Sequence, residues 1–159
     1  MRATIDLLVS KLDGLLPRHG IVLGSGLGSL VEAVDVVTRI PYSELDAFPV
    51  SAVSGHAGEL VAGKLNGVPV IMLSGRVHYY EKGDAAAMRR PLEVLKGIGV
   101  THLILTNSAG SLREDMPPGS VMRISDHINF TGRNPLIGEE TDDRFVGLTN
   151  AYDADMAAD

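Results

Sequence analysis

The sequence contains no cysteine and no tryptophan, and aromatic residues make up only 4% of its 159 residues. Without cysteine the chain can form no disulfide, no thiolate nucleophile and no cysteine-ligated zinc site. Lysine and arginine number 14 against 20 acidic residues, which gives a net charge of −6. Nucleic acids and anionic membranes attract basic surfaces, so this balance argues against both as partners. Any anion-binding site in this chain must therefore be local.

Long apolar runs are also missing. No run approaches membrane-spanning length, and the amino terminus carries charge and lacks the apolar core of a signal peptide. We therefore expect a cytoplasmic protein with no membrane partner. Hydrophobic residues nevertheless make up 45% of the chain, which is enough for the core of one ordinary domain.

Apolar periodicity predicts helices and strands in alternation. Helical spacing predicts helices over residues 5–16 and 27–34, and a third that runs from Asp84 towards Gly97 or Gly99 and is kinked at Pro91. Short apolar runs predict strands over residues 20–24, 60–65, 68–73 and 101–106. The dipeptide Asn66-Gly67 separates two of these strands and is typical of a tight hairpin. The pattern predicts an α/β fold with a mixed central β-sheet flanked by helices.

Three segments rich in glycine and polar residues each follow one of the predicted strands. They are Gly24-Ser25-Gly26-Leu27-Gly28, Gly75-Arg76-Val77-His78-Tyr79-Tyr80-Glu81 and Thr106-Asn107-Ser108-Ala109-Gly110-Ser111. Strands that end at a common sheet edge bring hydroxyl, guanidinium, imidazole and backbone N–H donors around one anion. The ligand that we predict for this edge is phosphate.

Each segment alone also has a structural explanation. The glycines of residues 24–28 complete neither a dinucleotide-binding motif nor a P-loop, and a sharp turn explains them equally well. Arg76 and His78 project to one side if the strand continues, although either residue alone is more often a surface ion pair or a satisfied core histidine. Tyr80 continues this alternation, yet a tyrosine there more often packs. The presence of three similar segments favours one shared crevice.

Other candidate motifs have competing explanations. His56 lies in a glycine-flanked loop that either covers the anion or joins two strands. Asp126-His127 is half of a catalytic pair, but neighbours on a strand point to opposite faces, which favours a local hydrogen bond. The sequence has no convincing Gly-x-Ser-x-Gly elbow and no His-Glu-x-x-His zinc motif, which disfavours a hydrolase or a metal centre.

Taken together, the motifs resemble those of the trimeric purine nucleoside phosphorylases. The three segments are joined in this resemblance by Phe48-Pro49, Gly55-His56-Ala57-Gly58, Asp126-His127-Ile128-Asn129 and Asn134-Pro135-Leu136. The motifs occur in the family's order over nearly the whole chain, so the joint match is specific although each piece is weak. The resemblance implies the nucleoside phosphorylase fold. It also implies reversible phosphorolysis of inosine- and guanosine-type nucleosides to the purine base and ribose 1-phosphate.

The resemblance further implies roles for individual residues. The implied phosphate ligands are Ser25, His56, Arg76, His78 and the backbone at Ser108. Tyr80 is an implied ribose contact, and Phe145 is another that a neighbouring subunit of a homotrimer supplies. Asn107 matches a position beside the phosphate and the nucleoside, and we group it with Arg76 and His78 as the catalytic set. Inorganic phosphate is a co-substrate, so we expect no cofactor and no metal.

Members of this family continue well beyond residue 159, and their purine-binding residues lie in that further part. The resemblance therefore implies that residues 1–159 are the N-terminal portion of a single α/β phosphorylase domain, incomplete at the C-terminus and inactive alone. The alternative functions are a methylthioadenosine phosphorylase and a non-catalytic phosphate-binding fragment. Glycosidic cleavage passes through an oxocarbenium-like state that bound phosphate can stabilise and attack, so the reaction needs no protein nucleophile.

Overall fold

The computed structural model describes residues 1–49 and 58–158, which divide into two compact units, Met1–Ser108 and Ala109–Asp159. In the described part of the chain, every β-strand and α-helix belongs to the first unit, and the second contains one short 3-10 helix, η3 (Asp142–Arg144). None of the helices in this part of the chain has the length and apolar character needed to cross a membrane.

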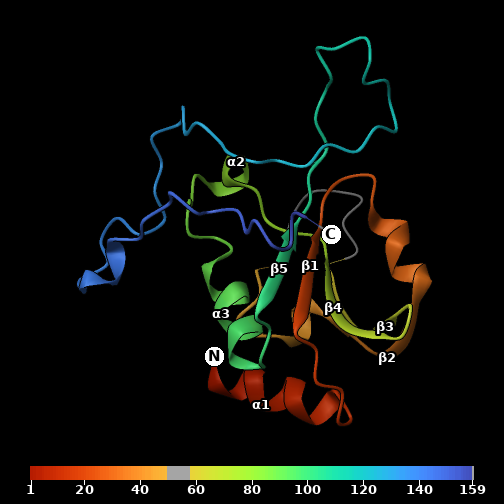
Figure 1. The fold of residues 1–159 in the computed structure, drawn as a ribbon. Coiled ribbons are helices and arrows are strands. Elements are labelled where there is room, and N and C mark those ends of the chain that lie inside the picture. Colours follow the sequence, from red (N-terminus) through yellow and green to blue (C-terminus); the bar gives the residue numbers. More distant parts are fainter. Residues whose placement is uncertain (50–57, 159) are drawn as a thin grey trace. The chain divides into compact units, whose positions relative to one another are not determined.

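A mixed five-stranded sheet organises the first unit, with the strand order β2-β3-β4-β1-β5 (Figure 1). The strands are β1 (His19–Leu23), β2 (Val34–Pro41), β3 (Glu59–Leu65), β4 (Val68–Ser74) and β5 (His102–Leu105). β3 pairs antiparallel with β2 and β4, whereas β1 runs parallel to both β4 and β5. The mixed α/β sheet predicted from the sequence is confirmed.

Helices cover both faces of this sheet. They are α1 (Arg2–Lys11), α3 (Arg89–Gly97), η1 (Gly28–Ala33) and η2 (Tyr42–Glu44), whereas the one-turn helix α2 (Tyr79–Lys82) contains no buried residue. Ile71 of β4 belongs to a core cluster that includes Leu8 of α1 and Leu95 of α3, whereas its neighbour Met72 belongs to a second cluster with Val31 of η1. Alternate side chains of a strand point to opposite faces, so a strand covered on both sides needs a continuous apolar run.

The predicted hairpin is confirmed in detail. Asn66 and Gly67 have φ angles of 50° and 83°, and Leu65 pairs with Val68 across them. Two consecutive residues with positive φ suit the two-residue turn whose twist matches that of the flanking strands. The Asn-Gly signal thus fixed both the turn and the register of β3 against β4.

Two of the predicted helices form as α-helices but with different bounds. The first occupies Arg2–Lys11 rather than residues 5–16, and α3 begins at Arg89 rather than at residue 84. Asp84 instead caps a turn, since its Oδ1 accepts a hydrogen bond from the backbone N–H of Ala86 at 2.8 Å. Pro91 therefore lies in the first turn of α3, where a backbone N–H has no helical acceptor, and it removes no helical hydrogen bond.

The helix predicted over residues 27–34 is wrong in extent and type. Only a 3-10 helix forms, and it ends at Ala33, after which the chain enters β2. Most β2 side chains are exposed, and only Val34 and Ile40 are buried, so the strand lacks a clear apolar alternation. Pairing with β3 stabilises β2, and this pairing cannot be predicted from the residues of β2 alone.

Tyr42 of η2 is buried and supports the backbone just before Arg76. Its hydroxyl donates a hydrogen bond to the carbonyl oxygen of Gly75 at 2.8 Å, and its ring lies 5.0 Å from that of Phe48. Gly75 has a φ of 112°, a conformation that favours glycine. Burial, and secondarily the charge of Glu59, raises the pKa of Tyr42 above its usual range.

We predict that Tyr42→Phe lowers the free energy of unfolding by about 1 kcal/mol, because the buried carbonyl of Gly75 loses its donor. The raised pKa of Tyr42 means that the unfolded chain releases the phenol proton more readily than the folded chain. Wild-type stability should therefore fall as the pH rises above about 10, the pKa of an unperturbed tyrosine.

Urea unfolding at about pH 8 and about pH 11 measures this difference. Tyr42→Phe should lose less stability between the two pH values than the wild type. Tyr80→Phe is the matched control, because Tyr80 is 73% exposed. An equal alkaline loss in Tyr42→Phe and wild type would contradict the assignment.

Candidate functional site

The three predicted site segments leave the sheet at one edge. Because β1 is parallel to β4 and β5, the carboxyl ends of all three strands lie together. Leu23 pairs with Ser74, and Val22 pairs with Leu105. Gly24, Gly75 and Thr106, the first residues after these strands, therefore start adjacent segments.

Thr106 connects all three segments by hydrogen bonds. Its hydroxyl accepts from the backbone N–H of Gly24 at 2.8 Å and donates to the carbonyl oxygen of Val22 at 3.0 Å. Its own carbonyl oxygen accepts from the Arg76 guanidinium. The segments after β1, β4 and β5 are thus tied to one residue.

Gly24 packs tightly against the segment after β5. A Cβ atom at this position would lie 2.7 Å from the carbonyl oxygen of Thr106 and 2.8 Å from the Cα of Asn107. Both neighbours are backbone atoms, so only glycine fits without moving the chain. The first glycine of the loop therefore serves a close backbone approach, and Ser25 follows it directly.

Arg76 is half-buried beside this junction. A guanidinium carries five N–H groups in a planar fork, and the bond to Thr106 uses one of them. This bond fixes the fork near the end of β5. The chain bend at Gly75, held by Tyr42, sets where the arginine leaves the sheet.

The predicted extension of the strand through Tyr80 is wrong, because α2 begins at Tyr79. His78 is the N-cap of this one-turn helix: its backbone N–H donates to Glu81 Oε1 at 2.7 Å, and its side chain accepts from the Glu81 N–H. The turn nevertheless keeps two predicted residues together, since the His78 and Tyr80 rings stack at 4.9 Å and 9°. Glu81, which the sequence analysis gave no role, holds His78 in place.

The remaining predicted residues lie in different parts of the chain. Ser25, Asn107 and Ser108 are exposed, and Asn107 Nδ2 donates to the carbonyl of Ser108 at 3.3 Å. Phe145 belongs to the second unit, is 74% exposed and carries the Arg144 guanidinium 4.8 Å above its ring. His56 lies outside the described residues.

The local hydrogen bond predicted for Asp126-His127 is confirmed. Asp126 Oδ1 accepts from the backbone N–H of His127 at 2.8 Å, and the His127 ring contacts the Tyr152 hydroxyl at 3.1 Å. Within residues 1–49 and 58–158, no three histidine, aspartate or glutamate side chains come together in a metal-binding group.

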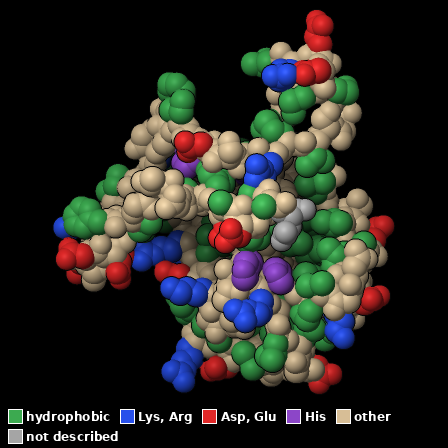
Figure 2. All heavy atoms as spheres, viewed as in Figure 1, with side chains coloured by type: hydrophobic (Ala, Val, Ile, Leu, Met, Phe, Trp, Pro, Cys, Tyr) green, Lys and Arg blue, Asp and Glu red, His purple; other side chains and the backbone are tan. Residues whose placement is uncertain are grey.

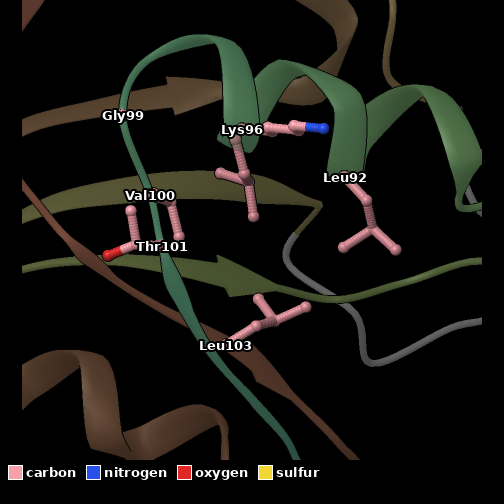
Figure 3. Close-up of a pocket in the computed structure, with 7 residues that line it drawn as sticks. Leu92, Lys96, Gly99, Val100, Thr101 and Leu103 are labelled. Carbon is pink, nitrogen blue, oxygen red and sulfur yellow. The ribbon is translucent and has the colours of Figure 1, made fainter. Parts of the chain in front are cut away.

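Two further features lie away from this edge. A groove of about 420 Å³ runs between α3 and β5, and its wall is apolar, with Leu92, Val100 and Leu103 among its residues (Figure 3). None of the predicted site residues lines it, and an apolar wall does not suit phosphate.

At the amino ends of β1 and β5, the rings of His19 and His102 stack at 5.2 Å, and two histidine side chains lie side by side in Figure 2.

Comparisons with known proteins match residues 18–158 to the phosphorylase superfamily. Purine nucleoside phosphorylase 1 of Geobacillus stearothermophilus is 47% identical over 139 residues, which cover 86% of this chain and 51% of that protein. The purine nucleoside phosphorylase of Bos taurus is 42% identical over 146 residues, covering 88% and 50%. The chain thus spans about half the length of the curated relatives that it matches.

Solved structures share the fold. Isoform 2 of the Schistosoma mansoni purine nucleoside phosphorylase, in complex with cytosine and ribose-1-phosphate, superposes with a TM-score of 0.82 at 35% identity, covering 98% of this chain and 57% of that one. A schistosomal purine nucleoside phosphorylase in complex with hypoxanthine gives 0.81 at 34% identity, with the same coverage. Fold, motifs and relatives agree, and the chain belongs to the phosphorylase superfamily.

Proposed function

We propose that the protein containing this sequence catalyses the phosphorolysis of purine ribonucleosides such as inosine and guanosine. The products are the free purine base and ribose 1-phosphate. The observation that carries the proposal is the junction of the three strand-end segments at Thr106, with the Arg76 guanidinium bound to it. The activity named for the relatives, and the ribose-1-phosphate in a similar structure, support the same reaction.

Phosphate is the nucleophile in this proposal. A phosphate oxygen forms a bond to the anomeric carbon of the ribose as the bond from that carbon to the purine nitrogen breaks. The electron pair of the broken bond leaves with the purine, and the purine takes up the proton that hydrogen phosphate loses when it becomes the sugar ester. The dianion also stabilises the positive charge that develops on the sugar.

Donors at the strand ends hold the phosphate. The planar fork of Arg76 suits two phosphate oxygens, and the Ser25 hydroxyl, the Ser108 backbone N–H and the His78 imidazole add single donors. We also assign His56 to the phosphate and Asn107 to the place between phosphate and nucleoside. Donors fixed before binding lose little entropy when the anion arrives.

The sugar site involves two aromatic residues. We assign the Tyr80 hydroxyl to the ribose, and the exposure of this side chain, 73%, with its ring stacked on His78, supports the assignment. We propose that Phe145 covers the ribose of a neighbouring copy in a homotrimer that acts in the cytoplasm in purine salvage. None of the residues named here is assigned to recognition of the purine.

Replacing Arg76 with lysine should lower kcat/KM for phosphate about 100-fold in the full-length protein, because lysine keeps the charge but loses the fork. Hypoxanthine release from inosine at varied phosphate concentration measures this effect. Arg89→Lys is the matched control, since Arg89 is exposed and pairs with Glu93 on α3 at 3.0 Å.

Several outcomes of this assay would contradict the proposal. An unchanged phosphate dependence in Arg76→Lys would remove Arg76 from the site. Phosphate binding by calorimetry with no release of base would indicate a phosphate-binding protein without catalysis. Much faster cleavage of methylthioadenosine than of inosine would indicate the related phosphorylase.

Mixing two impaired variants tests the shared site. Phe145→Ala and Arg76→Lys subunits, unfolded and refolded together, should form some sites that combine an intact Arg76 with an intact Phe145 from the neighbouring subunit. The mixture should then be more active than the mean of the two separate proteins. Activity equal to that mean would show that Phe145 does not act across subunits.

A further inference from the structure

The hydroxyl of Thr106 both accepts and donates a hydrogen bond. It accepts from the Gly24 N–H at 2.8 Å and donates to the Val22 carbonyl at 3.0 Å, while the Thr106 backbone N–H donates to the same carbonyl at 3.1 Å. Gly24 and Thr106 are 82 residues apart in the sequence. The hydroxyl therefore joins the end of β1 to the end of β5 where the ladder of backbone pairs stops.

The same residue also holds the arginine. Its carbonyl oxygen accepts from the Arg76 guanidinium, and Gly24, which its hydroxyl holds, directly precedes Ser25. Movement of Thr106 would therefore change the spacing between the Ser25 loop and the Arg76 fork. The backbone at Gly24 is closely packed against Thr106, because a Cβ atom at Gly24 would lie 2.7 Å from the Thr106 carbonyl oxygen.

We propose that Thr106 is a positioning residue whose hydroxyl fixes the Ser25 loop relative to Arg76. This inference rests on the proposed function, since the two groups that it sets are the proposed phosphate donors. Thr106 is assigned no contact with a reacting atom, since its hydroxyl and its carbonyl oxygen bind other parts of the chain. Without the hydroxyl, the part-buried Gly24 N–H loses its acceptor, and the loop is free to leave the geometry that suits the anion.

The test compares three variants of the full-length protein. Thr106→Val keeps the shape and removes the hydroxyl, Thr106→Ala removes the hydroxyl and the branch, and Thr106→Ser keeps the hydroxyl and loses the methyl group. Both hydroxyl-free variants should raise KM for phosphate about tenfold, the equivalent of one lost hydrogen bond. KM for inosine should change less, and Thr106→Ser should restore the wild-type KM for phosphate.

A second readout does not depend on activity. Amide hydrogen exchange at Gly24 should be faster in Thr106→Val and Thr106→Ala than in wild type and Thr106→Ser. If the wild type shows no phosphate-dependent cleavage, the proposed function fails while the exchange measurement still tests the positioning. If the amide of Gly24 exchanged at the same rate in Thr106→Val and Thr106→Ala as in the wild type, the inference would be overturned. A lowered melting temperature without any change in KM for phosphate, or a failure of Thr106→Ser to restore that KM, would also overturn it.

Discussion

The parallel pairing of β1 with both β4 and β5 is the constraint on which the rest of this chain depends. Parallel neighbours end at the same sheet edge, so the residues that follow these strands must meet there. Three loops of different composition are thereby placed around one point without any long-range charge attraction. A chain with a net charge of −6 can gather hydrogen-bond donors at one place in this way, because their grouping depends on local geometry and not on the overall charge.

The parts of the fold that the sequence predicted correctly are those with strong local signals. Asn66-Gly67 carries the turn chemistry in the residues themselves, and the buried runs of β3 and β4 need no distant information. β2 escaped prediction because its stability comes from pairing with β3 rather than from apolar alternation. α2 escaped because its single turn is stabilised by the reciprocal bonds of His78 and Glu81, and histidine is not the usual residue at that cap.

The candidate site was predictable to a similar degree. Glycine, arginine and hydroxyl residues after apolar strands indicated the edge and the residue types, and the structure brings these segments together there. The sequence could not show how they are joined, since Gly24 and Thr106 are 82 residues apart. It also placed Tyr80 on an extended strand, although one helical turn stacks its ring on His78.

The order of the strands in the sheet also limits the order in which the chain can fold. β2, β3 and β4 are neighbours in sequence as well as in the sheet, with a two-residue turn between the last two. β1 is synthesised before them, yet it pairs with β4 and then with β5, whose His102 lies opposite His19. Closing such long loops costs entropy before any contact compensates for it, so non-local pairings of this kind form slowly. During synthesis, β1 therefore has no strand partner until β4 has been made, and its second partner, β5, follows later still.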